Sequence, residues 1–179
     1  GKRVLVAGSG PLLLATAATL RRHGAQVLGV LEQASARELA AFAATLWRWP
    51  ARAWQAARLR AQLAGVPYRC GGFVTHAFGE GRLRAVSWRD ARGTHQLECD
   101  HLAVGYGLVP NVELAALLGC ALDHVGTHPH VRVDELLRTS VPGVLAAGEA
   151  LGIGGLAAAR FEGTLAGHVV AGALKPARA

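Results

Sequence analysis

The sequence lacks methionine, has only three cysteines, and contains no apolar run near the roughly 20 residues that a membrane-spanning helix needs. Arginines and glycines interrupt every candidate segment, so we expect no membrane span. The cysteines, Cys70, Cys99 and Cys120, form no Cys-x-x-Cys pair, which excludes a redox-active dithiol motif and a cysteine cluster that binds iron and sulphur. Cys70 and Cys99 are most simply interpreted as buried small apolar residues.

The absence of methionine extends to the first position, and the first predicted strand begins almost at Gly1. We therefore expect the 179 residues to be one part of a longer chain. No charged and then apolar leader with a cleavage site is visible, and the cysteines are scattered, so we expect a reducing, cytoplasmic location. The hydrophobic fraction of 51% is enough for one good core or two small ones.

Lysine is also scarce, because 17 of the 19 basic residues are arginine. The net charge of +7 would by itself suggest a nucleic-acid partner. Arginine together with abundant alanine is, however, what the coding bias of a GC-rich genome produces. We therefore expect no nucleic-acid partner.

The first motif is a glycine turn between a predicted strand and a predicted helix. Residues 4–7 are apolar, Gly8-Ser9-Gly10 ends this run, and apolar residues with helical spacing follow over residues 12–20. Gly8 lets the backbone turn sharply, and Gly10 lets it approach a phosphate at the helix N-terminus. Pro11 suits the first helical turn. This pattern is typical of the start of a nucleotide-binding βαβ unit.

The second predicted strand, residues 26–31, ends at Glu32, whose carboxylate would accept hydrogen bonds from ribose hydroxyls and favour NAD over NADP. Leu13 stands where the fingerprint has its third glycine, so its side chain would push the helix away from the strand. Two interpretations remain open: a functional dinucleotide or adenylate site, or a Rossmann-like unit that has lost its ligand. The predicted nucleotide-binding residues are Gly8, Ser9, Gly10, Pro11, Leu12 and Glu32.

Two helices are expected next. Ser35 is placed to cap a helix that ends at about residue 46, and Pro50 precedes a second helix over about 51–63. Tryptophans and arginines alternate over residues 47–60, a composition that can stack on a nucleic-acid strand. We favour the alternative that some of these tryptophans are core residues and others form a docking face for another protein.

The rest of the first hundred residues predicts strands. A short strand is expected at 66–69, followed by a three-stranded meander at 73–78, 82–88 and 94–99 and a buried strand at 102–105. A helix over 113–118, a short buried strand at 144–147 and a long helix over about 156–173 complete the prediction. The fold class is therefore α/β, with a Rossmann-like parallel sheet and a three-stranded β-meander crossover.

Four potential metal ligands lie near one another in the middle of the chain. Cys120, His124, His128 and His130 have the side chains that bind zinc or iron. Gly126 and Pro129 would break any helix that could align these residues. We therefore expect a polar surface loop and no metal.

Two later motifs resemble the pyridine nucleotide-disulphide oxidoreductase superfamily of two-dinucleotide-binding flavoproteins. Residues 100–111, Asp-His-Leu-Ala-Val-Gly-Tyr-Gly-Leu-Val-Pro-Asn, look like its returning strand, and residues 139–149, Thr-Ser-Val-Pro-Gly-Val-Leu-Ala-Ala-Gly-Glu, look like its flavin-contacting motif. The residues of these motifs are most similar to those of one branch of the superfamily. This branch contains the large FAD-binding subunits of opine oxidase, hydrogen cyanide synthase and dye-linked proline dehydrogenase. That branch does not have the redox-active cysteine pair, in agreement with its absence here.

This resemblance implies FAD as the cofactor of the intact protein, with NAD or another adenine nucleotide possible at the first site. Glu149 stands at the position of the family's aspartate, which hydrogen-bonds the ribityl and phosphate region of FAD. A glycine-rich turn at a helix start also suits the flavin's pyrimidine carbonyls, which gain negative charge on reduction. The implied flavin-side residues are Gly105, Gly148, Glu149, Gly154, Gly155 and Leu156.

The resemblance further implies a nucleotide-binding domain over residues 1–99 and, over 100–179, the returning strand and the C-terminal part of a discontinuous FAD-binding domain. The N-terminal FAD-binding half would be missing, and the isolated fragment would be inactive. The intact enzyme would oxidise an amine or opine-like C–N bond with flavin as hydride acceptor, alongside a second flavoprotein subunit. Two alternatives remain open: an NADH-dependent flavin reductase, and a non-catalytic nucleotide-binding or subunit-docking module. The sequence names no catalytic residue.

Overall fold

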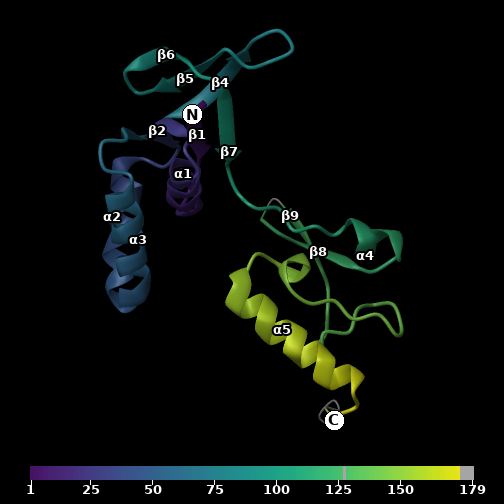
Figure 1. Cartoon of the computed structure of the whole chain (residues 1–179). Helices are drawn as coiled ribbons and strands as arrows, with labels where there is room; N and C mark the ends of the chain where they lie inside the picture. The colour runs from purple at the N-terminus through teal and green to yellow at the C-terminus, as the bar shows by residue number, and fades with distance from the viewer. Residues whose placement is uncertain (127, 174–179) are drawn as a thin grey trace. The chain divides into compact units, whose positions relative to one another are not determined.

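The computed structural model describes residues 1–126 and 128–173. The chain divides into two compact units, the first ending at Gly107 and the second beginning at Leu108 (Figure 1). The returning strand pairs with the first strand and so lies in the first unit. Within the described residues, no helix is both long and apolar enough to cross a bilayer.

The first unit is built on a parallel sheet with the strand order β3-β2-β1-β7. Its strands are β1 (Arg3–Gly8), β2 (Gln26–Glu32), β3 (Tyr68–Cys70) and β7 (His101–Gly105). All three pairings are parallel, as crossover connections require. β1 lies inside the sheet and is buried almost throughout, which explains its continuous apolar run.

Helices cover one face of this sheet. α1 (Leu12–Arg22) and the end of α3 (Pro50–Gln62) pack there on Val6 and Val30. Between β2 and α3 lie α2 (Ala36–Thr45) and the short 3₁₀ helix η1 (Leu46–Arg48). The predicted start of α2 is confirmed: Ser35 accepts a hydrogen bond from the Glu38 N–H, and the Glu38 carboxylate accepts one from the Ser35 N–H.

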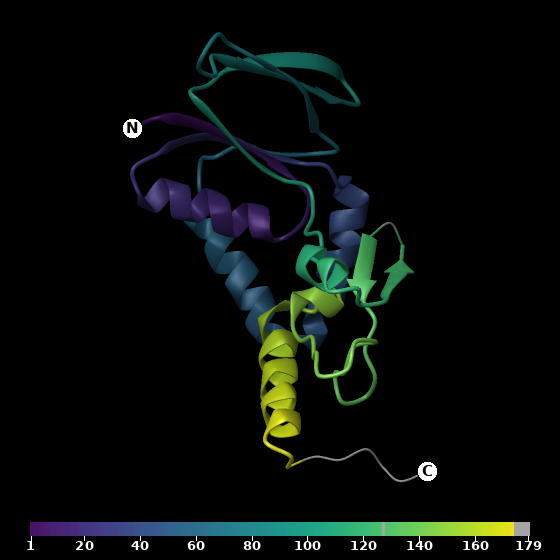
Figure 2. The ribbon, with the colours of Figure 1, turned by 90° about the vertical axis from the view of Figure 1, so that its right-hand side faces the viewer.

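The predicted meander covers the other face (Figure 2). Its antiparallel strands are β4 (Phe73–Phe78), β5 (Ala85–Asp90) and β6 (Gly93–Glu98). Leu5, Ala7 and Leu31 of the parallel sheet pack against Val86 and Trp88. β5 starts at Ala85 rather than at residue 82, since the Arg84 N–H donates to the Phe78 carbonyl and closes a longer turn. β3 likewise starts at Tyr68, two positions after the predicted start.

The second unit contains α4 (Glu113–Leu117), a hairpin of β8 (Leu122–Val125) and β9 (His128–Val131), the 3₁₀ helix η2 (Glu149–Leu151) and α5 (Gly155–Val170). The hairpin corrects the expectation of a loop around the histidines. Its register pairs Asp123 with His130 and His124 with Pro129, so His124 and His130 point to opposite faces. Among the described residues, no three metal-ligating side chains lie close enough to hold an ion.

The predicted buried strand at residues 144–147 is wrong. A single bridge joins Arg138 to Leu145, and the segment is only half-buried. The Thr139 hydroxyl donates to the Val144 carbonyl and its oxygen accepts from the Val141 N–H. These bonds close a compact turn, which an apolar sequence run alone does not reveal.

Candidate nucleotide-binding site

The glycine turn lies where β1 ends beside β7. A Cβ atom added at Gly8 would lie 2.0 Å from the carbonyl oxygen of Gly105, which no side chain allows. The Ser9 N–H donates to that same oxygen at 2.8 Å. Glycine at position 8 therefore permits the two strand ends to approach closely. The structure brings together Gly8 and Gly105, which belong to two different motifs of the sequence.

Gly10 shapes the start of α1. Its φ of 93° lies in the left-handed region, and a Cβ there would meet nothing within 4 Å. α1 begins after Pro11 without a capping side chain, and its first turn has no acidic residue. The positive dipole end of this helix is therefore available to an anion, while the Leu13 N–H donates to the Gly10 carbonyl at 3.2 Å.

Glu32 is fully buried at the end of β2 and turns toward the glycine loop. Its carboxylate accepts hydrogen bonds from the Gly10 N–H at 3.1 and 3.3 Å, from the Ala34 N–H at 3.0 Å, and from the Tyr68 hydroxyl at 3.1 Å. A buried carboxylate is tolerated only when donors of this kind surround it. Glu32 thus fixes the loop that the sequence assigns to phosphate binding.

Tyr68 is the residue that sequence reasoning missed. β3 pairs with β2 so that Tyr68 lies opposite Val30, within reach of Glu32 across the strand ends. Burial, and then the negative charge of Glu32, raise the pKa of the Tyr68 hydroxyl above its usual range. Burial also raises the pKa of the Cys70 thiol, with Glu32 as the second cause. Both groups therefore stay neutral beside the carboxylate at physiological pH.

Leu13 occupies the third glycine position of the fingerprint and is buried in the core between α1 and the sheet. One of its methyl groups lies 3.9 Å from the place where a Cβ at Gly105 would stand. At this contact α1 therefore contributes the large side chain of Leu13, and β7 contributes a glycine without a side chain. A Cβ at position 105 would only make an ordinary van der Waals contact with Leu13, so this packing does not by itself require glycine there.

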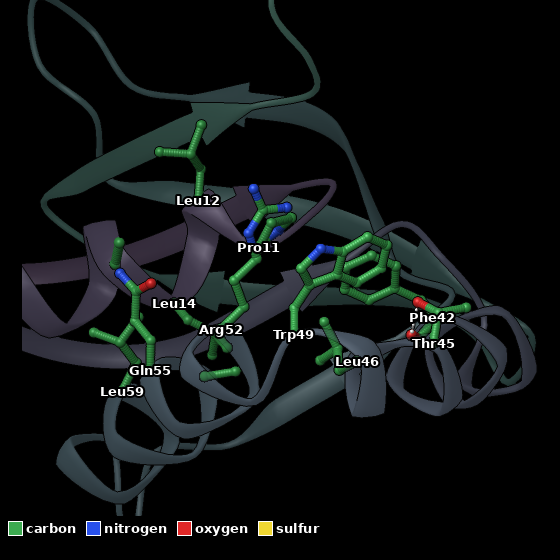
Figure 3. A pocket seen from close by; sticks show the side chains of 12 residues that line it. Pro11, Leu12, Leu14, Phe42, Thr45, Leu46, Trp49, Arg52, Gln55 and Leu59 are labelled. Carbon is green, nitrogen blue, oxygen red and sulfur yellow. Dashed lines mark hydrogen bonds between the residues drawn. The ribbon is translucent and has the colours of Figure 1, made fainter. Parts of the chain in front are cut away.

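A groove opens beside the loop, between α1 and the α2–η1–α3 segment. One cavity of about 480 Å³ is lined by Ser9, Gly10, Glu32 and Tyr68 on its polar side and by α2 residues on its apolar side. A neighbouring cavity of about 380 Å³ reaches Trp49 and Arg52 (Figure 3). The groove offers hydrogen-bonding groups at one end and a long apolar wall.

The expected flavin-side residues Gly148 and Glu149 lie in the second unit. Gly148 has a φ of 84°, and its N–H donates to the Glu162 carboxylate on α5 at 2.6 Å. Glu149 starts η2, and its carboxylate makes no hydrogen bond or ion pair within the part of the chain that the structure describes. Glu162 was not anticipated, because only the fold brings α5 back to Gly148.

The start of α5 is a helix terminus without a side-chain cap or an acidic first turn. Gly154 precedes it, and a Cβ there would lie 2.7 Å from the Cβ of Ala158. Gly155 has a φ of 79°, and Leu156 is 76% exposed. Gly154 and Gly155 thus let the chain turn into α5 with its N–H groups free, an arrangement that fits carbonyl or phosphate oxygens.

The family described as "Pyridine nucleotide-disulphide oxidoreductase" matches residues 1–170. The chain is 31% identical over 175 residues to the HcnB subunit of hydrogen cyanide synthase from Pseudomonas aeruginosa, covering 90% of this chain and 37% of the relative. It is 28% identical over 179 residues to an opine oxidase subunit from Rhizobium meliloti, covering 93% and 38%. The chain thus spans less than two fifths of the length of these curated relatives.

Solved structures share the fold. A thioredoxin reductase of T. acidophilum superposes with a TM-score of 0.64 at 24% identity, over 93% of this chain and 50% of that one. Putidaredoxin reductase in its covalent complex with putidaredoxin gives a TM-score of 0.69 at 23% identity, over 99% and 42%. These likenesses agree with the predicted α/β class and its Rossmann-like sheet.

Proposed function

The chain belongs to the pyridine nucleotide-disulphide oxidoreductase family of flavin-dependent enzymes. We propose that it forms part of an FAD-dependent oxidoreductase that oxidises an amine or opine-like C–N bond. The observation that carries the proposal is the match over residues 1–170 to a family of oxidoreductases, together with relatives named as subunits of opine oxidase and hydrogen cyanide synthase. We propose that the missing N-terminal half of the FAD-binding domain lies outside these 179 residues. The isolated chain is then inactive.

Residues 108–173 would supply the second half of the flavin site. The free N–H groups of Gly155 and Leu156 at the start of α5 would donate to flavin oxygens, and Glu149 would accept from ribityl hydroxyls directly or through water. Glu162 would act indirectly, by holding the Gly148 N–H. Bound FAD would supply the two-electron acceptor for the substrate's C–N bond.

The first unit would bind an adenine nucleotide, with its diphosphate over residues 8–12 and its ribose near Glu32. The turn at Gly8 and Gly10, the uncapped start of α1 and the buried Glu32 carboxylate support this assignment. These features also favour a second candidate function, an NADH-dependent flavin reductase. The two functions differ in what reduces the flavin.

A second flavoprotein subunit is the proposed partner. The relatives are named as subunits, and two tryptophans of the first unit, Trp47 and Trp54, are 77% and 73% exposed. Exposed tryptophans beside arginines are typical of interfaces. We also propose a cytoplasmic location, which the three unpaired cysteine thiols support.

The experiment uses the complete protein that contains this chain, purified with its flavin. Amine, amino-acid and opine substrates are each offered with an artificial electron acceptor, and NADH is offered in parallel. Substrate-dependent acceptor reduction supports the oxidase function. Acceptor reduction with NADH alone supports the reductase, and a protein without flavin contradicts both.

A further inference from the structure

The groove extends from the glycine loop to the first turn of α3. Its two cavities share five lining residues, among them Pro11, Leu14 and Phe42, and therefore adjoin each other. Gly10 lines one cavity, Arg52 lines the other, and Pro11 lines both. Residues that the sequence assigns to the helical crossover thus face the same groove as the predicted nucleotide loop.

Two arginines line this groove: Arg52, and Arg60, whose guanidinium carbon lies 5.6 Å from the centre of the Tyr68 ring. In Figure 3 the Arg52 side chain extends from α3 toward Pro11 at the start of α1, and both residues line the same cavity. The guanidinium carbon lies 5.8 Å from the centre of the Trp49 ring, a distance that allows a cation–π contact. Trp49 thereby restricts the directions in which Arg52 points.

No acidic side chain neutralises Arg52 within the described residues, where no carboxylate forms an ion pair with it. The two carboxylates that line the groove, Glu32 and Glu38, instead accept hydrogen bonds from backbone N–H groups and, for Glu32, from the Tyr68 hydroxyl. An exposed guanidinium without an ion-pair partner, set beside the positive end of a helix dipole, attracts an anion with more than one oxygen.

The remaining walls restrict the kind of anion. The Ser9 hydroxyl and the exposed Glu38 carboxylate can hydrogen-bond sugar hydroxyls at the polar end, and Leu14, Phe42 and Leu46 provide an apolar wall for a flat ring. A sugar with hydroxyls, an aromatic base and a phosphate chain together make a nucleoside diphosphate moiety. ADP, ATP and NAD all contain one.

We infer that Arg52 binds the phosphate groups of a nucleoside diphosphate moiety in this groove, so that the crossover helix α3 completes the nucleotide site. This inference rests on the proposed nucleotide role of the first unit. It adds a binding residue that lies outside the glycine fingerprint, and it assigns Trp49 the role of positioning that residue.

The test compares Arg52→Ala with Arg58→Ala in the complete, flavin-loaded protein. Arg58 is exposed on the same helix but lines neither cavity, so it is a matched control for charge. Isothermal titration with ADP and with adenosine measures affinity at low and high salt. We expect Arg52→Ala to weaken ADP binding about tenfold at low salt and to reduce the salt dependence, with adenosine binding unchanged. Arg58→Ala binds ADP like the unmodified protein.

Arg52→Lys separates the two contributions of the side chain. It keeps the charge and loses the paired donors, and we expect it to recover only part of the lost affinity. The inference is overturned if Arg52→Ala binds ADP normally, if it loses adenosine and ADP equally, or if the unmodified protein binds no ADP. Flavin content and amine oxidation in the same preparations report separately on the proposed function.

Discussion

The hydroxyl of Tyr68 donates a hydrogen bond to Oε2 of Glu32 at 3.1 Å, which ties β3 to the buried carboxylate at the end of β2. The same carboxylate holds the Gly10 N–H, so one side chain connects the third strand with the glycine loop. The shape of the candidate nucleotide site therefore depends on its glycines and also on this contact between β3 and β2.

Replacing Tyr68 by phenylalanine should destabilise the first unit. The variant removes a hydrogen bond to a buried carboxylate, and we expect a loss of about 2 kcal/mol in the free energy of unfolding. Tyr106→Phe is the control, because the Tyr106 oxygen accepts only from the Val74 N–H in an exposed setting. Urea denaturation of the 179-residue chain measures both variants. Equal losses in the free energy of unfolding would show that the Tyr68–Glu32 hydrogen bond stabilises the unit no more than the exposed Tyr106 bond does.

Tyr68 should also make stability depend on alkaline pH. Its pKa is raised in the folded protein, so the unfolded chain loses this proton first as pH rises above about 10. The stabilisation is therefore complete below that pH and decreases above it. Denaturation at a series of pH values should show a decline that is shallower in Tyr68→Phe. Parallel curves for the two proteins would contradict this assignment.

The sequence predicted the elements that local chemistry determines. Ser35 and Glu38 form their capping box, Gly8 marks the turn after β1, and the meander follows its alternating pattern. The partners of Glu32 and Gly148 were not predictable in this way. Tyr68 reaches Glu32 only because β3 pairs with β2, and Glu162 reaches Gly148 only because α5 folds back. Such contacts depend on topology and on side-chain direction.

The two errors in the second unit have physical causes. Apolar residues at 144–147 resemble a buried strand, but the Thr139 side chain closes a turn there. Gly126 and Pro129 oppose a helix, so the sequence predicts a loop at the histidines near residue 128, although neither residue opposes a hairpin end.

Glu32 should decide the preference among nicotinamide nucleotides. A carboxylate near the ribose favours NADH, because a 2′-phosphate would bring a second negative charge close to it. Calorimetry should show tighter binding of NADH than of NADPH, and Glu32→Ala should reduce the difference. A preference for NADPH, or affinities unchanged in the variant, would argue against this placement of the ribose.

The segment from Trp47 to Arg60 should not bind nucleic acid. Its arginines lie on helices that form no recognisable nucleic-acid module, and the surplus of arginine has a compositional origin. We expect only weak oligonucleotide binding in fluorescence anisotropy. Submicromolar affinity at low salt that falls steeply with added salt would overturn this expectation.

Glu149 should contribute to flavin retention in the complete protein. Its carboxylate is proposed to bind the ribityl region, so Glu149→Ala should lose flavin, whereas the isolated 179 residues should be colourless. Glu135→Ala is the control, because it removes a carboxylate of the same unit that we assign to no site. Flavin absorbance per protein, after gel filtration, gives the result. Normal flavin content in Glu149→Ala would remove this residue from the site, and stoichiometric FAD on the isolated chain would show that the flavin site is misplaced.

The central claim is that the intact protein takes electrons from a C–N bond by means of its flavin. The most direct measurement is anaerobic titration of the flavin-loaded complete protein with opines, amino acids and NADH, followed by the yellow absorbance of oxidised flavin. We predict that an amine or opine substrate bleaches the flavin stoichiometrically and that NADH does not. Bleaching by NADH alone, or a flavin that no C–N substrate reduces, would contradict the account.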